Sequence, residues 1–276
     1  METIKKGSRG SDVKKLQELL YMENCDGIFG PATEACLVAW QSQHGLVPDG
    51  ICGPKSWAAL IATPATATTG TSIKVNYTPT KTLCTARPGR KVKYIVIHYT
   101  AGSSSAAGKA AATAPMWLKR YKANPKNGAS ADFVVDDKEI VQVNPDLRNY
   151  SCWAVGGNIY SGYGGASLNG IATNANTISI EICSSHRSGY DISAPNHEGW
   201  YFTDAVLDNA VRLTRYLMKE FDIPIERVIR HYDVKGKPCP GIVGWNDAPL
   251  FDAKTGKQLK TRNTSEKWQA FKRRLQ

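Results

Sequence analysis

A polar segment that begins at residue 62 constrains the fold of this 276-residue chain most, because it separates two structural units. Residues 62–72 read Ala-Thr-Pro-Ala-Thr-Ala-Thr-Thr-Gly-Thr-Ser, which are small and mostly polar side chains without apolar periodicity. This composition is typical of a linker. We therefore predict a first unit over residues 1–61, a linker over residues 62–83 and a larger unit over residues 84–276.

The overall composition is that of a soluble globular protein, with 42% apolar and 21% charged residues. No apolar run approaches the roughly 18 residues that span a bilayer. The start, Met1-Glu-Thr-Ile-Lys-Lys-Gly7, has no apolar stretch after its lysines, so we expect no secretory signal. The expected location is the cytoplasm of the host cell, unless another protein releases the chain.

Seven cysteines stand at positions 25, 36, 52, 84, 152, 183 and 239, an odd number without a tight pairing pattern. This distribution favours reduced thiols over an oxidised framework. It also leaves room for one thiol with a chemical role.

The net charge of +11 is unevenly distributed along the chain. Residues 1–61 carry 6 basic and 7 acidic side chains, whereas residues 252–276 alone carry 8 basic and 2 acidic ones. Such a balance predicts an anionic partner, which can be nucleic acid, a membrane surface or a polyanionic cell wall. The charge alone does not distinguish among these three kinds of partner.

The first unit contains an internal repeat. Asp26-Gly-Ile-Phe-Gly-Pro-Ala-Thr33 recurs 23 residues later as Asp49-Gly-Ile-Cys-Gly-Pro-Lys-Ser56. In each copy we expect a turn at Asp-Gly, an aliphatic side chain that enters the core, and a helix that opens at Gly-Pro. With an earlier helix capped by Ser11 or Asp12, this predicts a small all-α unit of three helices.

The larger unit alternates between strand and helix patterns. Its β-branched runs predict strands over residues 92–97, 131–135, 139–143 and 177–183, of which the middle two form a hairpin. Helical patterns cover residues 106–123, where Pro115 should interrupt the helix, residues 202–221, and a short segment capped by Ser265. We therefore predict an α/β fold with a mixed central sheet flanked by helices.

Three residues of this unit have side chains that suit a metal site. His98 follows the strand 92–97, and His231 and Cys239 frame a loop. Zinc accepts imidazole and thiolate, and three protein ligands leave a fourth position for water, whereas a fourth protein ligand would make the site structural. The residues alone leave another interpretation open, because a buried cysteine or a single histidine is often only part of the packing.

The repeat of the first unit, together with Gly7-Ser-Arg-Gly-Ser-Asp-Val13 ahead of Leu16-Gln17, resembles the peptidoglycan-binding domain 1 family. The resemblance covers residues 4–61. It implies a non-catalytic module that anchors the chain to the cell wall. The alternative is an unrelated three-helix bundle.

Five segments of the larger unit occur in an order that one enzyme family shares. They are Tyr94-Ile-Val-Ile-His-Tyr-Thr-Ala-Gly102, Ser130 to Val143, Trp153-Ala-Val-Gly156, Asn176 to Ile182 and His231 to Pro240. In this order they resemble the zinc-dependent N-acetylmuramoyl-L-alanine amidase family 2, related to phage T7 lysozyme and the peptidoglycan recognition proteins. The resemblance implies zinc as cofactor and assigns its ligands to His98, His231 and Cys239.

The resemblance also implies roles for residues near the metal. Zinc lowers the pKa of a bound water from 15.7 to roughly 7, and Glu181 is expected to accept a proton from this water and pass it to the leaving amine. Lys237 matches a lysine of the family and is expected to steady the developing oxyanion. Tyr99, Thr100 and Trp153 are candidate substrate-binding residues. Without the resemblance, Glu181 and Lys237 could be merely solvated side chains.

The chain departs from the family pattern at two places. Ala131 stands where some relatives have a functional tyrosine, and Asp132 replaces a common histidine. This makes Glu181 the better candidate for proton transfer, with Asp132 as the next one. Ala154 replaces a histidine after Trp153, which removes one usual substrate contact.

The predicted function is that of a peptidoglycan hydrolase, most like a phage or prophage endolysin, that is held in the host cytoplasm until lysis. It would act as a monomer on the bond between N-acetylmuramic acid and L-alanine, and its basic C-terminal segment could contact anionic wall polymers or membrane. A non-catalytic recognition protein of the same fold is the main alternative, but such relatives generally lack the cysteine ligand. A nucleic-acid binder would explain the charge but lacks a recognised motif, and a zinc endopeptidase would have other ligand spacing.

Overall fold

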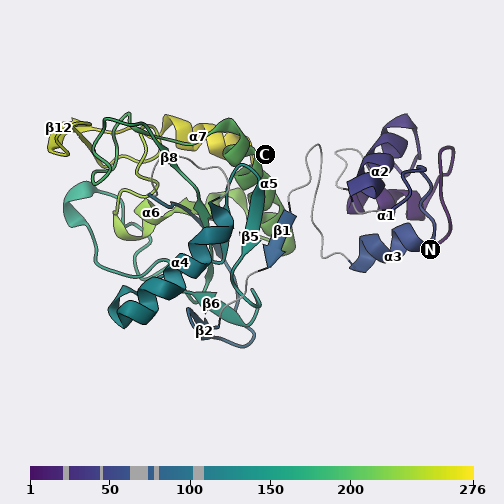
Figure 1. Ribbon diagram of the computed structural model, residues 1–276, viewed down its shortest axis with the longest axis horizontal. Coiled ribbons are helices and arrows are strands. Elements are labelled where there is room, and N and C mark those ends of the chain that lie inside the picture. The colour runs from purple at the N-terminus through teal and green to yellow at the C-terminus, as the bar shows by residue number, and fades with distance from the viewer. Residues whose placement is uncertain (21–24, 44–45, 63–73, 78–80, 102–108) are drawn as a thin grey trace. The chain divides into compact units, whose positions relative to one another are not determined.

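The computed structural model describes residues 1–20, 25–43, 46–62, 74–77, 81–101 and 109–276. The chain divides into two compact units, Met1–Ile73 and Lys74–Gln276, which are described separately (Figure 1). Most of the predicted linker, residues 63–73 and 78–80, lies outside the described residues. The same holds for residues 102–108, where the helix predicted over 106–123 was expected to begin.

The first unit contains the three helices that the repeat predicts: α1 (Ser11–Leu19), α2 (Pro31–Gln43) and α3 (Pro54–Ala62). Their buried faces meet in one apolar core that includes Val13, Leu16, Phe29, Leu37 and Trp57. The predicted cap of the first helix is wrong. Gly10 is the N-cap, with a φ of 119°, and no side chain caps the helix.

A buried glutamine from the preceding helix holds each turn of the repeat. Its amide nitrogen donates to the Asp carboxylate and to the Ile carbonyl of the turn, and its amide oxygen accepts from the Gly N–H. The residues are Gln17 for the first copy and Gln41 for the second, with donor–acceptor distances of 2.8–3.1 Å. Each copy of the repeat therefore includes a glutamine that lies in the preceding helix, outside the turn motif itself.

The aliphatic residue of each turn does not enter the core, contrary to our expectation. Ile28 and Ile51 are 39% and 38% exposed, whereas the residues that follow them, Phe29 and Cys52, are buried. The chain is extended at this point, and successive side chains of extended backbone point in opposite directions. The core position in the motif is therefore one residue later than expected.

The second unit is built on a six-stranded mixed sheet with the strand order β1-β5-β4-β7-β3-β10. All neighbouring pairs are parallel except β4 and β5, which form the predicted hairpin. The strands are β1 (Lys74–Tyr77), β3 (Tyr94–Tyr99), β4 (Phe133–Val135), β5 (Glu139–Gln142), β7 (Thr177–Ile182) and β10 (Val228–Arg230). Strand β1 lies within residues 62–83, so the larger unit begins earlier than the predicted linker boundary.

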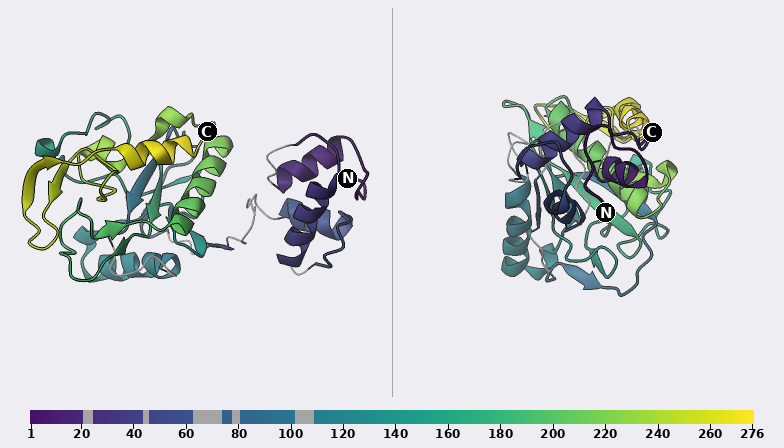
Figure 2. Two further views of the ribbon diagram at one scale, coloured as in Figure 1. Left: turned by 90° about the horizontal axis from the view of Figure 1, so that it is seen from above. Right: turned by 90° about the vertical axis from the view of Figure 1, so that its right-hand side faces the viewer.

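Helices cover both faces of this sheet, which confirms the predicted fold class (Figure 2). Helix α4 (Ala110–Ala123) packs on the face that carries Val134 and Val141, and α5 (Asp204–Glu220) packs on β3, β4, β5 and β7. Pro115 lies inside α4 without ending it, contrary to our expectation. Proline has no N–H, so the helix lacks one backbone hydrogen bond there, and the residue lies on the exposed side of the helix.

Shorter elements complete the unit. Helix α6 (His231–Lys235) follows β10, and α7 (Glu266–Arg273) buries Trp268 and Phe271 as predicted, although Ser265 makes no side-chain cap. Two-stranded ribbons are β2 (Cys84–Ala86) with β6 (Tyr150–Cys152), β8 (Ser185–His186) with β9 (Trp200–Tyr201), and β11 (Pro249–Phe251) with β12 (Gln258–Arg262). Single 3₁₀ turns occur at Pro125–Asn127, Ser161–Tyr163 and Ile225–Arg227. None of the described helices is long and apolar enough to cross a bilayer.

Candidate functional site

The candidate site begins at the carboxyl edge of three neighbouring parallel strands, β7, β3 and β10. His98 and Glu181 are register partners on β3 and β7, so their side chains share one face of the sheet. His98 lies within β3 rather than just after it, because the strand runs two residues further than the pattern predicted. Polar side chains at this edge can converge, since parallel strands end together there.

The other two predicted ligands come from the segment after β10. His231 is the first residue of α6, and Cys239 follows once the chain has turned back at Gly236, which has a φ of 69°. A side chain at Gly236 would place its Cβ 2.5 Å from the carbonyl oxygen of Gly164, so only glycine fits. The N–H of Tyr232 donates to the carbonyl of Cys239 at 3.0 Å and ties the two ends of this loop together.

The loop after Cys239 is held by a buried pair of asparagines. Asn246 donates to the carbonyl of Pro240 at 2.6 Å and to the side chain of Asn196 at 2.7 Å. Asn196 donates back to Asn246 at 2.8 Å, and its own N–H donates to the carbonyl of Gly241 at 2.7 Å. The backbone next to Cys239 is therefore anchored from two elements. No sequence motif pointed to these residues.

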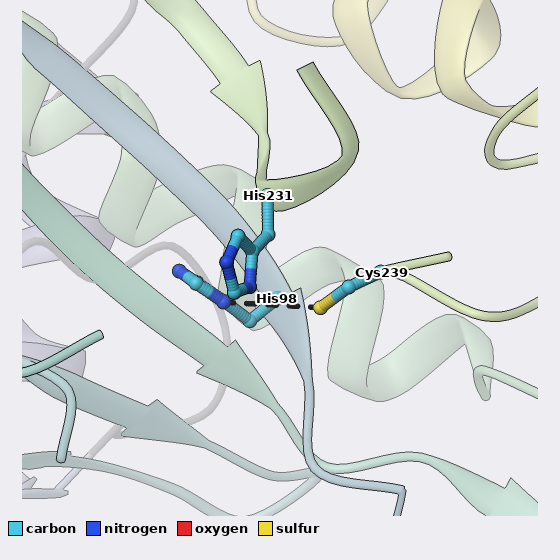
Figure 3. Close-up of side chains that lie close together, drawn as sticks. All are labelled: His98, His231 and Cys239. Carbon is cyan, nitrogen blue, oxygen red and sulfur yellow. Dashed lines mark hydrogen bonds between the residues drawn. The ribbon is translucent and has the colours of Figure 1, made fainter. Parts of the chain in front are cut away.

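The two histidines and the cysteine form one compact buried cluster (Figure 3). Their possible ligand atoms all lie within 4.8 Å of one another, and the Cys239 sulfur is 3.8 Å from Nδ1 of His98. The ring centroids of His98 and His231 are 4.8 Å apart. Residues separated by more than 130 positions in the chain thus meet at one point.

The hydrogen bonding of this cluster fits a metal ion. The Nε2 atoms of His98 and His231 are buried and have no partner among the described residues. A buried polar atom without a partner costs about 1–3 kcal/mol. The two imidazoles, each of which offers one ring nitrogen, and the Cys239 thiol form an N, N, S donor set that suits zinc. The backbone of Gly156 hydrogen-bonds to the His231 ring and orients it, as outer partners of metal-bound histidines do.

Burial keeps both imidazoles neutral, which is the form that binds metals. It lowers the pKa of His98 well below its usual value and that of His231 to about 3, and the Lys237 cation acts in the same direction. Burial raises the pKa of the Cys239 thiol to about 12, against the attraction of Lys237 and a hydrogen bond from the backbone of Tyr99. In the metal-free chain Cys239 is therefore a neutral thiol.

A pocket of about 220 Å³ opens above this cluster. Glu181 and the exposed Lys237 line it, and burial raises the pKa of Glu181 to about 8 although Lys237 opposes the shift. Oε2 of Glu181 has no partner among the described residues. The pocket thus places a carboxyl group and a cation beside the candidate metal ligands, which is an arrangement suited to metal-assisted hydrolysis.

All three predicted substrate-binding residues line the pocket. The Tyr99 ring packs edge-on against Trp200, with ring centroids 5.7 Å apart. Thr100 accepts a hydrogen bond from the N–H of Ser184 at 3.3 Å. The Trp153 indole donates to Thr85 at 2.9 Å, which fixes its orientation.

Sequence reasoning assigned no role to several other pocket residues. Ser130 donates to the carbonyl of Leu83 at 2.6 Å and accepts from the N–H of Trp153 at 3.0 Å, so it joins two parts of the pocket wall. Its position at the start of the hairpin motif was the available signal. The remaining wall residues are Ala101, Trp117, Ala129 and Ala154.

Asp132 does not line the pocket. It is buried 3.5 Å from Arg90, accepts from the N–H of Ser179 at 2.8 Å and from the side chain of Asn144 at 2.5 Å. Burial raises the pKa of Asp132, although Arg90 opposes the shift. The residue that replaces a histidine of the family pattern therefore supports the sheet and is not positioned for proton transfer in the pocket.

Comparison with known proteins assigns both units to families. The family model described as N-acetylmuramoyl-L-alanine amidase matches residues 88–242, and the model described as putative peptidoglycan binding domain matches residues 9–60.

Similar proteins include the N-acetylmuramoyl-L-alanine amidases CwlA and CwlH of Bacillus subtilis (strain 168). CwlA is 31% identical over 150 residues, which are 54% of this chain and 43% of CwlA. CwlH is 34% identical over 156 residues, which are 56% of this chain and 50% of CwlH. The chain thus spans half or less of the length of these two relatives. The solved catalytic domain of XlyA is 26% identical, with a TM-score of 0.46, over 74% of this chain and 100% of that domain.

Proposed function

The chain belongs to the N-acetylmuramoyl-L-alanine amidase family, and on this basis we propose that it is a peptidoglycan hydrolase. It cleaves the amide bond between the lactyl group of N-acetylmuramic acid and the L-alanine of the stem peptide. The observation that carries this proposal is the buried cluster of His98, His231 and Cys239 at a pocket that also contains Glu181 and Lys237.

The resident cofactor in this proposal is zinc, held by His98, His231 and Cys239. When bound, zinc supplies a water of lowered pKa and polarises the scissile carbonyl. Glu181 accepts a proton in the pocket and delivers it to the nitrogen of the departing L-alanine. For this the carboxyl must be ionised, and Lys237 favours the ionised form.

Lys237 has a second role at the carbonyl oxygen of the substrate. Lys237 is exposed and lines the pocket, and its charge acts on Glu181 and on all three candidate ligands. A cation there stabilises the negative charge that develops on the oxygen. Trp153, Tyr99 and Thr100 bind the remainder of the muropeptide along the wall of the pocket.

The first unit attaches the chain to peptidoglycan, as its family match suggests. Anionic wall polymers are the second partner and account for the positive charge of residues 252–276, in place of nucleic acid. The chain acts as a monomer. Its release from the host cytoplasm at lysis, as in an endolysin, stays a prediction.

A non-catalytic recognition protein of the same fold is the alternative from another class. The presence of Cys239 in the cluster favours the enzyme, because two imidazoles and a thiol that lie this close together suit a metal site.

Mass spectrometry of digested peptidoglycan tests the proposal. Purified sacculi are incubated with the zinc-loaded protein, with Glu181→Gln as the matched control. We expect stem peptides with a free N-terminal alanine, intact glycan strands, and little release by the control. Cleaved sugars or cleaved cross-bridges would overturn the assigned bond, and intact sacculi would favour the recognition protein.

A further inference from the structure

Two cysteines outside the candidate metal cluster face each other across the ribbon formed by β2 and β6. Cys84 and Cys152 are register partners in this antiparallel pair, and their sulfur atoms are 3.0 Å apart. Both are buried, with exposures of 8% and 2%. They are separated by 68 positions in the chain, so only the folded structure brings them together.

The hydrogen bonding of the ribbon puts this pair at a position that suits a cross-link. The N–H of Arg87 donates to the carbonyl of Asn149 at 2.7 Å. Hydrogen-bonded and non-hydrogen-bonded pairs alternate along antiparallel strands, so Cys84 and Cys152, three positions away, form a non-hydrogen-bonded pair. Consistently, the N–H of Cys84 donates to the carbonyl of Lys81 instead. The Cα atoms of such pairs are about 4.5 Å apart, within the range that a disulfide spans.

We propose that Cys84 and Cys152 form a disulfide when the protein is exposed to an oxidising environment, and that this bond fastens the wall of the pocket. The proposal does not depend on the hydrolase activity, because it concerns only these thiols and the ribbon that carries them. It departs, for this one pair, from the expectation that the cysteine distribution favours reduced thiols over an oxidised framework.

The oxidant is a small-molecule disulfide such as oxidised glutathione. The thiolate of Cys84, the more exposed of the two, attacks one sulfur of the small disulfide and expels one glutathione thiolate, which takes up a proton. The thiolate of Cys152 then attacks the Cys84 sulfur of the mixed disulfide and expels the second glutathione. Two protein thiols and one small disulfide thus become one protein disulfide and two small thiols.

The position of the ribbon explains what the bond would do. Cys152 directly precedes Trp153, which lines the pocket, and Leu83 directly precedes Cys84. The hydroxyl of Ser130 already joins these two strands through the carbonyl of Leu83 and the N–H of Trp153. A disulfide beside this bridge would keep the strands together when the hydrogen bonds break, so it stabilises the pocket wall.

Intact-mass and peptide analysis test the bond directly. The zinc-loaded full chain is equilibrated with excess oxidised glutathione, quenched by alkylation and weighed. We expect two fewer alkyl groups than in the reduced and alkylated control, without a lasting glutathione adduct on Cys84 or Cys152. Trypsin would leave Cys152 and Cys183 on one peptide, so the link is mapped in the Cys183→Ala variant, where residues 82–90 should be joined to residues 149–187.

Thermal unfolding tests the consequence. The oxidised chain should melt about 10 °C above the reduced chain, since the bond closes a long loop in a unit of this size. Cys84→Ala should show no such difference, whereas Cys183→Ala, which loses another buried thiol of the same unit, should retain it. The Cys84→Ala comparison also cancels any effect of the reductant on bound zinc.

Three outcomes would overturn the proposal: both thiols still alkylated after exhaustive exchange, a stable glutathione adduct on Cys84, or a link from either residue to another cysteine. Equal melting temperatures for the oxidised and reduced wild-type chain would overturn its stabilising role. The alkylation, adduct and melting comparisons use the wild-type chain, so they remain decisive even if a cysteine variant fails to fold.

Discussion

The Cys239 thiol couples metal binding to pH. Burial raises its pKa to about 12, so below that pH the metal-free chain holds a protonated sulfur. His231, with a pKa of about 3, is already neutral and releases no proton when it binds a metal. Zinc affinity should therefore rise about tenfold for each pH unit between roughly 6 and 8, because binding displaces one proton from sulfur.

Competition with a chelator across this pH range measures the slope. The variant Glu181→Gln is the control, since its side chain cannot add a second titrating group. Cys239→Ser should bind zinc much more weakly, because a hydroxyl is a poorer ligand than a thiolate. A wild-type affinity that does not change with pH would contradict the role of Cys239.

We expect a substitution of Glu181 to lower turnover without changing the zinc content of the protein. Glu181→Gln keeps the shape of the side chain but cannot accept a proton, so kcat should fall roughly 100-fold or more while zinc content stays unchanged. The raised pKa of about 8 means that activity of the wild type should decline as the pH falls and the carboxyl is protonated. A bound cation would lower the pKa of Glu181, because it favours the ionised carboxylate, and the decline would then occur at lower pH.

The pH profile of kcat/KM on a soluble muropeptide provides the measurement. The acidic decline should be absent from the residual activity of Glu181→Gln, and the exposed Glu226→Gln should behave like the wild type. Near-normal turnover of Glu181→Gln would mean that another group transfers the proton. Asp132 is not positioned in the pocket to replace it.

At the scale of elements, the buried pair of Asn196 and Asn246 stabilises the loop from His231 to Asn246. Asn246→Ala would remove the donor to the carbonyl of Pro240 and the donor to the side-chain oxygen of Asn196. Buried polar groups without partners are costly, so we expect a loss of about 2–3 kcal/mol in the free energy of unfolding. Because Pro240 follows Cys239, the same change should speed the loss of zinc to a chelator.

Urea unfolding and chelator kinetics measure these two effects, with the exposed Asn158→Ala as the matched control. Loss of stability with normal zinc retention would show that the asparagine pair supports the fold without positioning the cysteine. No change in either quantity would contradict its structural role.

At the scale of the whole molecule, the division into two units predicts separable functions. A fragment of residues 74–276 contains the complete sheet and all candidate site residues. It should bind zinc and hydrolyse soluble muropeptides at nearly the wild-type rate. On intact walls it should lose activity, because the first unit no longer raises its local concentration there, and the loss should grow with salt.

A shorter fragment that begins at residue 84 serves as the comparison. It lacks β1, which pairs with β5 at the edge of the sheet, and should therefore be less stable than residues 74–276. If residues 74–276 failed to cleave even soluble substrate, the first unit would have to complete the site or support the fold of the second.

The order and type of the main elements could be predicted from the sequence because these properties depend on neighbouring residues. The β-branched runs predicted β3 and β7, the apolar periodicity predicted α5, and the repeated turn predicted the helices of the first unit. Family resemblance supplied the candidate ligands, which the structure brings together in one cluster. Short strands such as β1 and β2 carry too few residues for a periodic signal, so they were missed.

The tertiary structure alone decided which side chains meet. Side-chain identity placed a carboxyl at Asp132 and at Glu181, but only the packing put the first beside Arg90 and the second in the pocket. The same holds for Ile28 on the surface, for the contact between Cys84 and Cys152, and for the asparagine pair. Local patterns determine whether a segment is extended or helical, whereas burial and contact depend on how distant segments pack.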